Sequence, residues 1–175
     1  MQKDLSTNRL VADFLTHSHR ISGSINVRQK KLADQLNDQS TSLLHLEEIY
    51  ISSIGRPGDI MTSHSSSTLR KQNIVAVVVS HQDDGLQREH TYGSYFGAHL
   101  HKVFLTVAQF EVEGYLRLSG RFDLRTVLTS DARGFIPIID GSIKASVYPD
   151  TIFTGGAILI NQAYIGALCE EKEEG

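Results

Sequence analysis

The chain of 175 residues contains no tryptophan, one cysteine and three prolines. Because Cys169 is the single cysteine, a disulfide within the chain is excluded. One free thiol is usual in a reducing compartment, and we expect a cytoplasmic protein. The longest apolar runs, at 74–79 and 155–160, are far shorter than the roughly 20 residues that cross a bilayer as a helix. We therefore expect no membrane partner.

An excess of charge is also missing. The chain has 17 basic and 20 acidic residues, which gives a net charge of −3 and a pI near 6.2. Such a balance provides no general attraction to nucleic acid or to anionic lipid. Residues 1–8 lack the apolar core of a secretory signal, so export by that route is not expected. The 40% hydrophobic content is that of an ordinary globular protein.

Motifs of the common enzyme classes are absent as well. A hydrolase elbow reads Gly-x-Ser-x-Gly, and the nearest segment, 93–97, has the wrong spacing. Gly155 and Gly156 are not followed by the lysine of a phosphate-binding loop. Asp83 and Asp84 are adjacent, and adjacent side chains on an extended chain point apart. We predict a non-enzymatic protein and assign no catalytic, cofactor-binding or metal-binding residue.

What the chain has instead is an internal repeat, which indicates a tandem duplication. Gly23 lies over Gly114 at an offset of 91 (114 − 23), together with the apolar positions around each glycine. Three further pairs of segments follow in the same order: 32–36 with 124–128, 43–46 with 135–138, and, at an offset of 90, 69–75 with 159–165. The halves share apolar spacing and glycine, so the repeat informs the fold more than the chemistry.

Alternating apolar and polar residues predict strands in each half. Segments 103–107 and 110–118 alternate with period two and are expected to pair as a hairpin. Gly23 and Gly114 stand inside strands, where glycine marks a bulge, a bend or a close approach of backbone, and we interpret both as barrel bends. A turn signal at 55–58 and the small polar residues at 62–68 predict a mobile loop, and the equivalent stretch of the second half, 150–156, is expected to be shorter.

Apolar residues spaced by three and four predict one short helix in each half, over 32–36 and 124–128. Asp123 is placed to cap the second helix. The predicted fold is mainly β, of α+β type, with two tandem ββαββ small-barrel units, Sm-like or SH3-like. The expected divisions are a first β-barrel-like repeat at 9–80, a linker at 81–98, a second repeat at 99–169 and an acidic tail at 170–175.

Two resemblances rest on these elements. The strand with Gly23, the helix Leu-Ala-Asp-Gln-Leu-Asn at 32–37 and the apolar strand at 43–46 resemble a family of small, uncharacterised bacterial domains, which implies no known activity. Gly-Tyr-Leu at 114–116, followed by the polar strand at 140–143 and Ala-Tyr-Ile at 163–165, is distantly similar to an Sm-type β-barrel. The RNA-contacting motifs of that family are not reproduced, so the resemblance implies the barrel without RNA binding.

The chain has eight histidines, a residue type that often binds metal ions. His17 and His19 flank one residue, as do His99 and His101, and on a strand this spacing aims two side chains one way. Two ligands do not make a zinc site, and Asp13, Glu89 and His90 are the nearby sequence candidates for a third. A histidine-based metal or small-molecule sensor remains an alternative.

Two dense clusters of basic residues, which we call the basic spots, are the candidate contacts for RNA. They are Arg28-Gln29-Lys30-Lys31 and Arg70-Lys71, and stacking would come from Tyr50 if the spots converged on one face with it. By elimination, we predict a binding or assembly module that associates with another protein or with itself, and that uses exposed sheet edges. No cofactor is expected. An Sm-like RNA-binding module is the first alternative, ahead of the sensor, although nucleic acid is not the expected partner.

Overall fold

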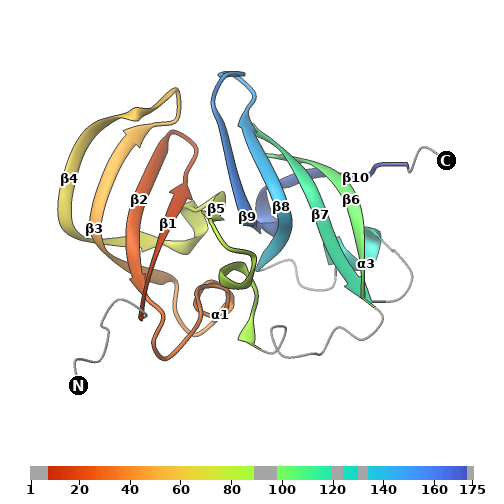
Figure 1. The fold of residues 1–175 in the computed structure, drawn as a ribbon, viewed down its shortest axis with the longest axis horizontal. Coiled ribbons are helices and arrows are strands. Elements are labelled where there is room, and N and C mark those ends of the chain that lie inside the picture. The colour runs from red at the N-terminus through yellow and green to blue at the C-terminus, as the bar shows by residue number, and fades with distance from the viewer. Residues whose placement is uncertain (1–7, 89–97, 120–123, 130–133, 173–175) are drawn as a thin grey trace.

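The computed structural model describes residues 8–88, 98–119, 124–129 and 134–172. Within them, ten strands form one antiparallel sheet in the order β10-β6-β7-β8-β9-β5-β1-β2-β3-β4 (Figure 1). The predicted mainly β class is therefore confirmed. The predicted small barrels are not, because the sheet is open and ends at β4 on one side and at β10 on the other.

The strands fall into two blocks of five, which we call the N-terminal block and the C-terminal block. The N-terminal block comprises β1 (Arg9–Leu15), β2 (His19–Asn26), α1 (Leu32–Asn37), β3 (Leu43–Ser53), β4 (Arg56–Arg70), the 3-10 helix η2 (Lys71–Asn73) and β5 (Ala76–Val79). A second 3-10 helix, η3 (Gln82–Gly85), follows it. The C-terminal block comprises β6 (Ala98–Val107), β7 (Phe110–Ser119), α3 (Leu124–Thr129), β8 (Phe135–Ala145), β9 (Ile152–Asn161), η4 (Gln162–Tyr164) and β10 (Ile165–Glu170).

Both blocks have the same strand order. It is β5-β1-β2-β3-β4 in one block and β10-β6-β7-β8-β9 in the other, so β1 corresponds to β6 and each later strand to the strand five places on. Each third strand has a β-bulge at the same place, where its pairing with the second strand of the block shifts register and one residue has positive φ, Glu48 at 50° and Asp140 at 47°. Each block thus has five described strands, which are the four of the predicted ββαββ unit and the added strand that the sequence pattern left open.

The register of the hairpins tests the repeat alignment. Ala12 lies opposite Gly23, and Val103 lies opposite Gly114, as the offset of 91 requires. The predicted hairpin at 103–107 and 110–118 is confirmed. The offset of 90 near the end of each half is wrong by one, because Leu69 pairs with Leu44 where Ile160 pairs with Ile136. Leu69 therefore corresponds to Ile160, at an offset of 91 (160 − 69).

Two segments predicted as loops are strands. The stretch 62–68 lies inside β4, a strand of 15 residues, and most of 150–156 lies in β9. The prediction failed for β4 because nearly all of its side chains are exposed on both faces, so no apolar alternation marks it. Pairing with β3 over most of its length holds it extended.

Two hydrophobic cores lie on the sheet, and each contains residues of both blocks. Core I, around Phe14, Leu32 and Leu46, includes four residues of the C-terminal block: Phe135, Ile139, Ala157 and Leu159. Core II, around Phe110, Val112 and Ile143, includes five residues of the N-terminal block: Leu15, Ile54, Val75, Ala76 and Val78. Burial of apolar surface stabilises each core by about 25 cal/mol per Å². Neither core is complete without the other block.

Candidate functional site at the sheet edges

The two blocks are joined by pairing between β5 and β9. Ala76 lies opposite Ile160, and Val79 lies opposite Ala157, with the two intervening pairs in the same antiparallel register. At the ends of this ladder, Asn161 N donates to Val75 O at 3.0 Å and Gly156 N donates to Ser80 O at 3.1 Å. All eight paired side chains are buried, so this junction is part of the interior.

Polar side chains reinforce the junction. Asn161 Nδ2 donates to Ile74 O at 2.9 Å, and the Tyr164 hydroxyl donates to Gln72 O at 2.5 Å. Asn37 accepts from Phe135 N at 2.7 Å and donates to its carbonyl at 3.3 Å. The hydrogen bonds of Asn161 and Asn37 reach buried or half-buried backbone groups and are costly to lose, so they fix how the two blocks meet.

The outer side of β4 has no neighbouring strand among the described residues. Between Ile60 and Leu69 this strand contains no Lys, Arg, Asp, Glu or Pro, which are the residues that usually protect an edge against pairing. Ile60 and Met61 are large and exposed. Figure 1 shows β4 at one end of the molecule and β10 at the other. We call the outer sides of these two strands the free edges.

The second free edge, on β10, is short and follows β6 with a bulge between Ile165 and Ala167. Leu168 is buried in core II, while Cys169 and Glu170 are exposed. Lys102 Nζ pairs with the Glu171 carboxylate at 2.9 Å, and Glu171 N donates to Lys102 O at 3.0 Å. The start of the predicted acidic tail is therefore fixed against β6, and residues 173–175 lie outside the described part of the chain.

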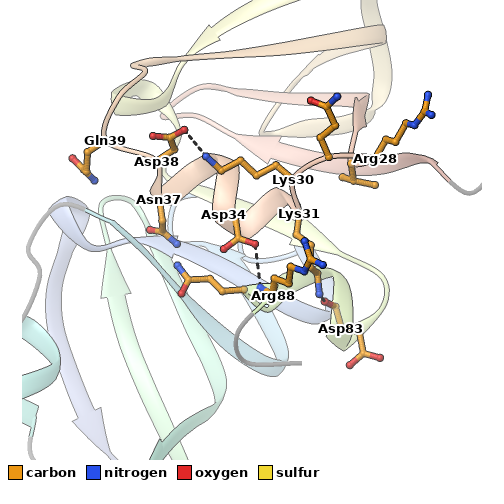
Figure 2. A pocket seen from close by; sticks show the side chains of 12 residues that line it. Arg28, Lys30, Lys31, Asp34, Asn37, Asp38, Gln39, Asp83 and Arg88 are labelled. Carbon is orange, nitrogen blue, oxygen red and sulfur yellow. Dashed lines mark hydrogen bonds and ion pairs between the residues drawn. The ribbon is translucent and has the colours of Figure 1, made fainter. Parts of the chain in front are cut away.

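A polar pocket lies beside α1, with a volume of about 1210 Å³ (Figure 2). It is lined by four basic side chains, Arg28, Lys30, Lys31 and Arg88, and by three acidic ones, Asp34, Asp38 and Asp83. Lys30 Nζ lies 2.5 Å from the Asp38 carboxylate, Lys31 Nζ donates to Asp83 O at 2.6 Å, and Arg88 N donates to Asp34 at 3.1 Å. One ion pair and two hydrogen bonds that each involve a main-chain atom thus link the residues that line this pocket.

Parts of the two basic spots predicted from sequence meet at Asp38. Lys30 holds its carboxylate, and Lys71 Nζ donates to its main-chain oxygen at 3.0 Å. Hydrogen bonds from Lys30 and then Ser40 hold the pKa of Asp38 well below its usual range. Lys71 is only 8% exposed, and its burial lowers the pKa of that ammonium. Tyr50 lines a different pocket, with Arg20 and Pro57, so the stacking residue does not join the lysines.

The histidine pairs lie at separate places. His17 Nδ1 lies 3.0 Å from Gln109 Oε1, and its ring meets Tyr164 edge-on at 5.0 Å, whereas His19 Nδ1 contacts the Ser18 hydroxyl at 2.9 Å. His101 lies 3.9 Å from Glu170. Among the described residues, no three His, Cys, Asp or Glu side chains are grouped so as to hold a metal ion. Glu89 and His90 lie outside those residues.

Exposed sheet edges were predicted, but the edge at β4 was not located, because β4 was not recognised as a strand. The repeat contains the signal, since β4 occupies the place that the apolar β9 occupies in the other block. No described helix is long and apolar enough to cross a bilayer. No protein-family model, curated protein or solved structure matches the chain.

Proposed function

We propose that this protein is a non-enzymatic association module that binds through the free edges of its sheet. It is built from two copies of one small-barrel-like unit of five strands with one short helix. The shared strand order and the matched bulges at Glu48 and Asp140 support this origin. A duplicated unit whose inner edges pair with each other leaves one edge of each type exposed at the ends.

The exposure of β4 carries the proposal. An edge strand presents a row of unpaired N–H and C=O groups, and long unprotected edges accept further strands. Natural sheets usually shorten such an edge or place lysine or proline on it. Here the strand is 15 residues long, and its ten residues from Ile60 to Leu69 include no Lys, Arg, Asp, Glu or Pro. A soluble domain keeps such an edge when a partner uses it.

RNA binding through the basic spots is a weaker candidate. Phosphate contact requires lysines that are free to release counterions. Lys30 is paired with Asp38, Lys31 with the carbonyl of Asp83, and Lys71 is buried. Binding to RNA would therefore break existing contacts. This alternative predicts a salt-sensitive affinity that falls when Lys30 and Lys31 are neutralised, and salt-independent or absent binding removes it.

The first test is native mass spectrometry of the protein isolated from its own cells without chelator, compared with a Ser65→Pro variant. Proline at an edge removes a backbone donor and hinders strand addition. We expect an oligomer or a stoichiometric protein complex that Ser65→Pro reduces and Ser65→Ala retains. If the proline variant shows no cooperative thermal unfolding by circular dichroism, Thr68→Lys replaces it as the test variant, because a lysine protects the edge by its charge. A chain that is monomeric and without a protein partner, or one that retains nucleotides or stoichiometric metal, contradicts the proposal.

A further inference from the structure

We propose that the partner at the free edges is a second copy of this chain, and that β4 of one copy pairs with β10 of the next. This inference rests on the proposed function and specifies it. The pairing follows the template inside the molecule, where β9 pairs with β5. Since β4 corresponds to β9 and β10 corresponds to β5, the free edges are of the same two types as the strands already joined.

The correspondence can be fixed residue by residue. Glu47 pairs with Ser66 just before the bulge at Glu48, and Ile139 pairs with Ala157 just before the bulge at Asp140. Ser66 therefore corresponds to Ala157. On the other side, Phe14 pairs with Val77, and Leu105 pairs with Leu168, so Leu168 corresponds to Val77.

Transferring the β5–β9 register to the free edges gives one defined ladder between copies. Its four pairs are Ala167 with Leu69, Leu168 with Thr68, Cys169 with Ser67, and Glu170 with Ser66. The two terminal hydrogen bonds transfer as well: Arg70 N takes the place of Asn161 N and donates to Gly166 O, while Ser65 N takes the place of Gly156 N and donates to Glu171 O.

Leu43 supplies an independent observation. Its counterpart in the C-terminal block, Phe135, is 7% exposed because it packs into core I of the other block. Leu43 occupies the same place beside β4 and is 47% exposed. In the proposed pairing, Leu43 packs against the β10 side of core II in the neighbouring copy. A large apolar side chain that is exposed in one chain thus gains the burial that its counterpart already has.

The side chains of the free edges suit a contact between copies that can also dissociate, because they tolerate exposure to water. Ala157, Ile158 and Leu159 correspond to Ser66, Ser67 and Thr68, so the edge tolerates water where the internal junction does not. Glu170 and Glu171 meet no acidic residue on the matching stretch of β4. We therefore expect an association that is weaker than the internal junction and depends on concentration.

The contact is heterologous, since the two surfaces that meet are different. Each added copy leaves a β4 edge at one end and a β10 edge at the other, so the sheet continues from copy to copy. Such a head-to-tail contact closes into a ring if the rotation per copy allows it and otherwise extends into a filament.

Cross-linking of two marked chains tests the register. One chain carries Ser67→Cys and Cys169→Ser, and the other is the unchanged chain with Cys169 as its only thiol and a tag that alters its mass. Directly opposed side chains lie about 4.5–5.5 Å apart, within reach of oxidation or of a short bis-maleimide. We expect one covalent product that contains one chain of each kind. The matched control replaces Ser67→Cys by Ser66→Cys, which places the thiol on the opposite face of the strand and lowers the yield at least severalfold.

The outcomes separate this inference from the proposed function. Cross-linked pairs of two Ser67→Cys chains in equal yield show a symmetric contact between β4 edges and overturn the head-to-tail register. An oligomer or protein complex that depends on Ser65 but gives no cross-link between positions 67 and 169 also overturns it, while edge binding stands. A monomer at every concentration, with no partner lost in Ser65→Pro, overturns both.

Discussion

The side-chain amide of Asn161 donates a hydrogen bond of 2.9 Å to the carbonyl of Ile74 and ties the end of β9 to the segment that leads into β5. The same side chain accepts from Ala163 N at 3.1 Å and so begins η4. Asn161 is 7% exposed, and water cannot replace these partners. One residue thus serves both the junction between the blocks and the local turn.

Asn161→Ala is expected to lower the free energy of unfolding by about 1 to 3 kcal/mol, because it leaves a buried carbonyl without its donor. Urea unfolding followed by circular dichroism measures the change. Arg70 corresponds to Asn161 at the free edge and is exposed, so Arg70→Ala is the matched control and is expected to stay within about 0.5 kcal/mol of the unchanged chain. Equal effects at the two positions would show that the amide bond is not what stabilises the junction.

The two strand glycines are predicted to differ in their tolerance of alanine. A Cβ at Gly23 would meet the Cγ2 methyl of Ile49 at 2.8 Å, with no backbone atom closer than 3.5 Å. A Cβ at Gly114 would meet Ile138 Cγ2 at 2.5 Å and also two backbone atoms of β8 at 3.0 Å. Gly114→Ala is therefore expected to cost more, within the roughly 1–3 kcal/mol range of overpacked cores.

A second substitution separates the two cases. Leucine lacks the Cγ2 branch, so Ile49→Leu is expected to restore much of the stability lost in Gly23→Ala. Ile138→Leu leaves the backbone contacts of Gly114→Ala in place and is expected to restore less. Thermal unfolding of the single and double variants measures how much stability each second substitution restores. Equal recovery of stability at both positions would contradict the role given to the β8 backbone.

Leu43→Ala is expected to weaken self-association and to leave the fold intact. Loss of the burial proposed for this side chain, about 1.4 kcal/mol, raises the dissociation constant about tenfold. Sedimentation equilibrium over a concentration series measures it. Val11 is 65% exposed on β1, inside the sheet, and Val11→Ala is the control that removes an exposed apolar side chain away from the free edges. If both variants associate alike, Leu43 is not part of the contact.

Lys71 and Lys102 predict opposite pH dependences. Burial lowers the pKa of Lys71, so the unfolded chain binds more protons as the pH approaches 10.5, and the unchanged chain gains stability relative to Lys71→Met over that range. The hydrogen bond from Lys102 to Glu171 raises the pKa of Lys102, so its contribution is present below 10.5 and is lost as the pH rises above it.

Urea midpoints of the unchanged chain, Lys71→Met and Lys102→Met, measured from neutral pH to above 10.5, test both signs. The difference between each variant and the unchanged chain removes the titration of other groups. A gain in stability of the unchanged chain over Lys71→Met that fails to appear as the pH rises would mean that Lys71 is hydrated in solution.

The elements that the sequence predicts correctly are those with one face on the core and the other face in solvent. In β7, Val112 and Leu116 face the core while Glu111 and Glu113 face solvent, and this alternation located both the strand and its partner. The helices α1 and α3 were found for a related reason, since Leu32, Ala33 and Leu36 share one buried face.

The part that failed is the edge. The serines of β4 have no apolar alternation, because neither face of that strand is covered, and its extended shape comes from pairing with β3. Pairing involves two segments, and it does not by itself produce an alternating apolar pattern in the sequence of either segment. The sequence-based prediction already included exposed sheet edges. Only the structure shows that the open end of the sheet, and with it the candidate binding edge, lies at β4.

Because each core contains residues of both blocks, the order of synthesis limits when each core can be completed. A ribosome delivers the N-terminal block first, yet core I includes Ala157 and Leu159 of β9, and Leu159 follows the last residue of β5 by 80 positions (159 − 79). Until those positions emerge, β5 presents its inner apolar edge without a neighbour. During synthesis, the first block therefore cannot complete core I until β9 has been added.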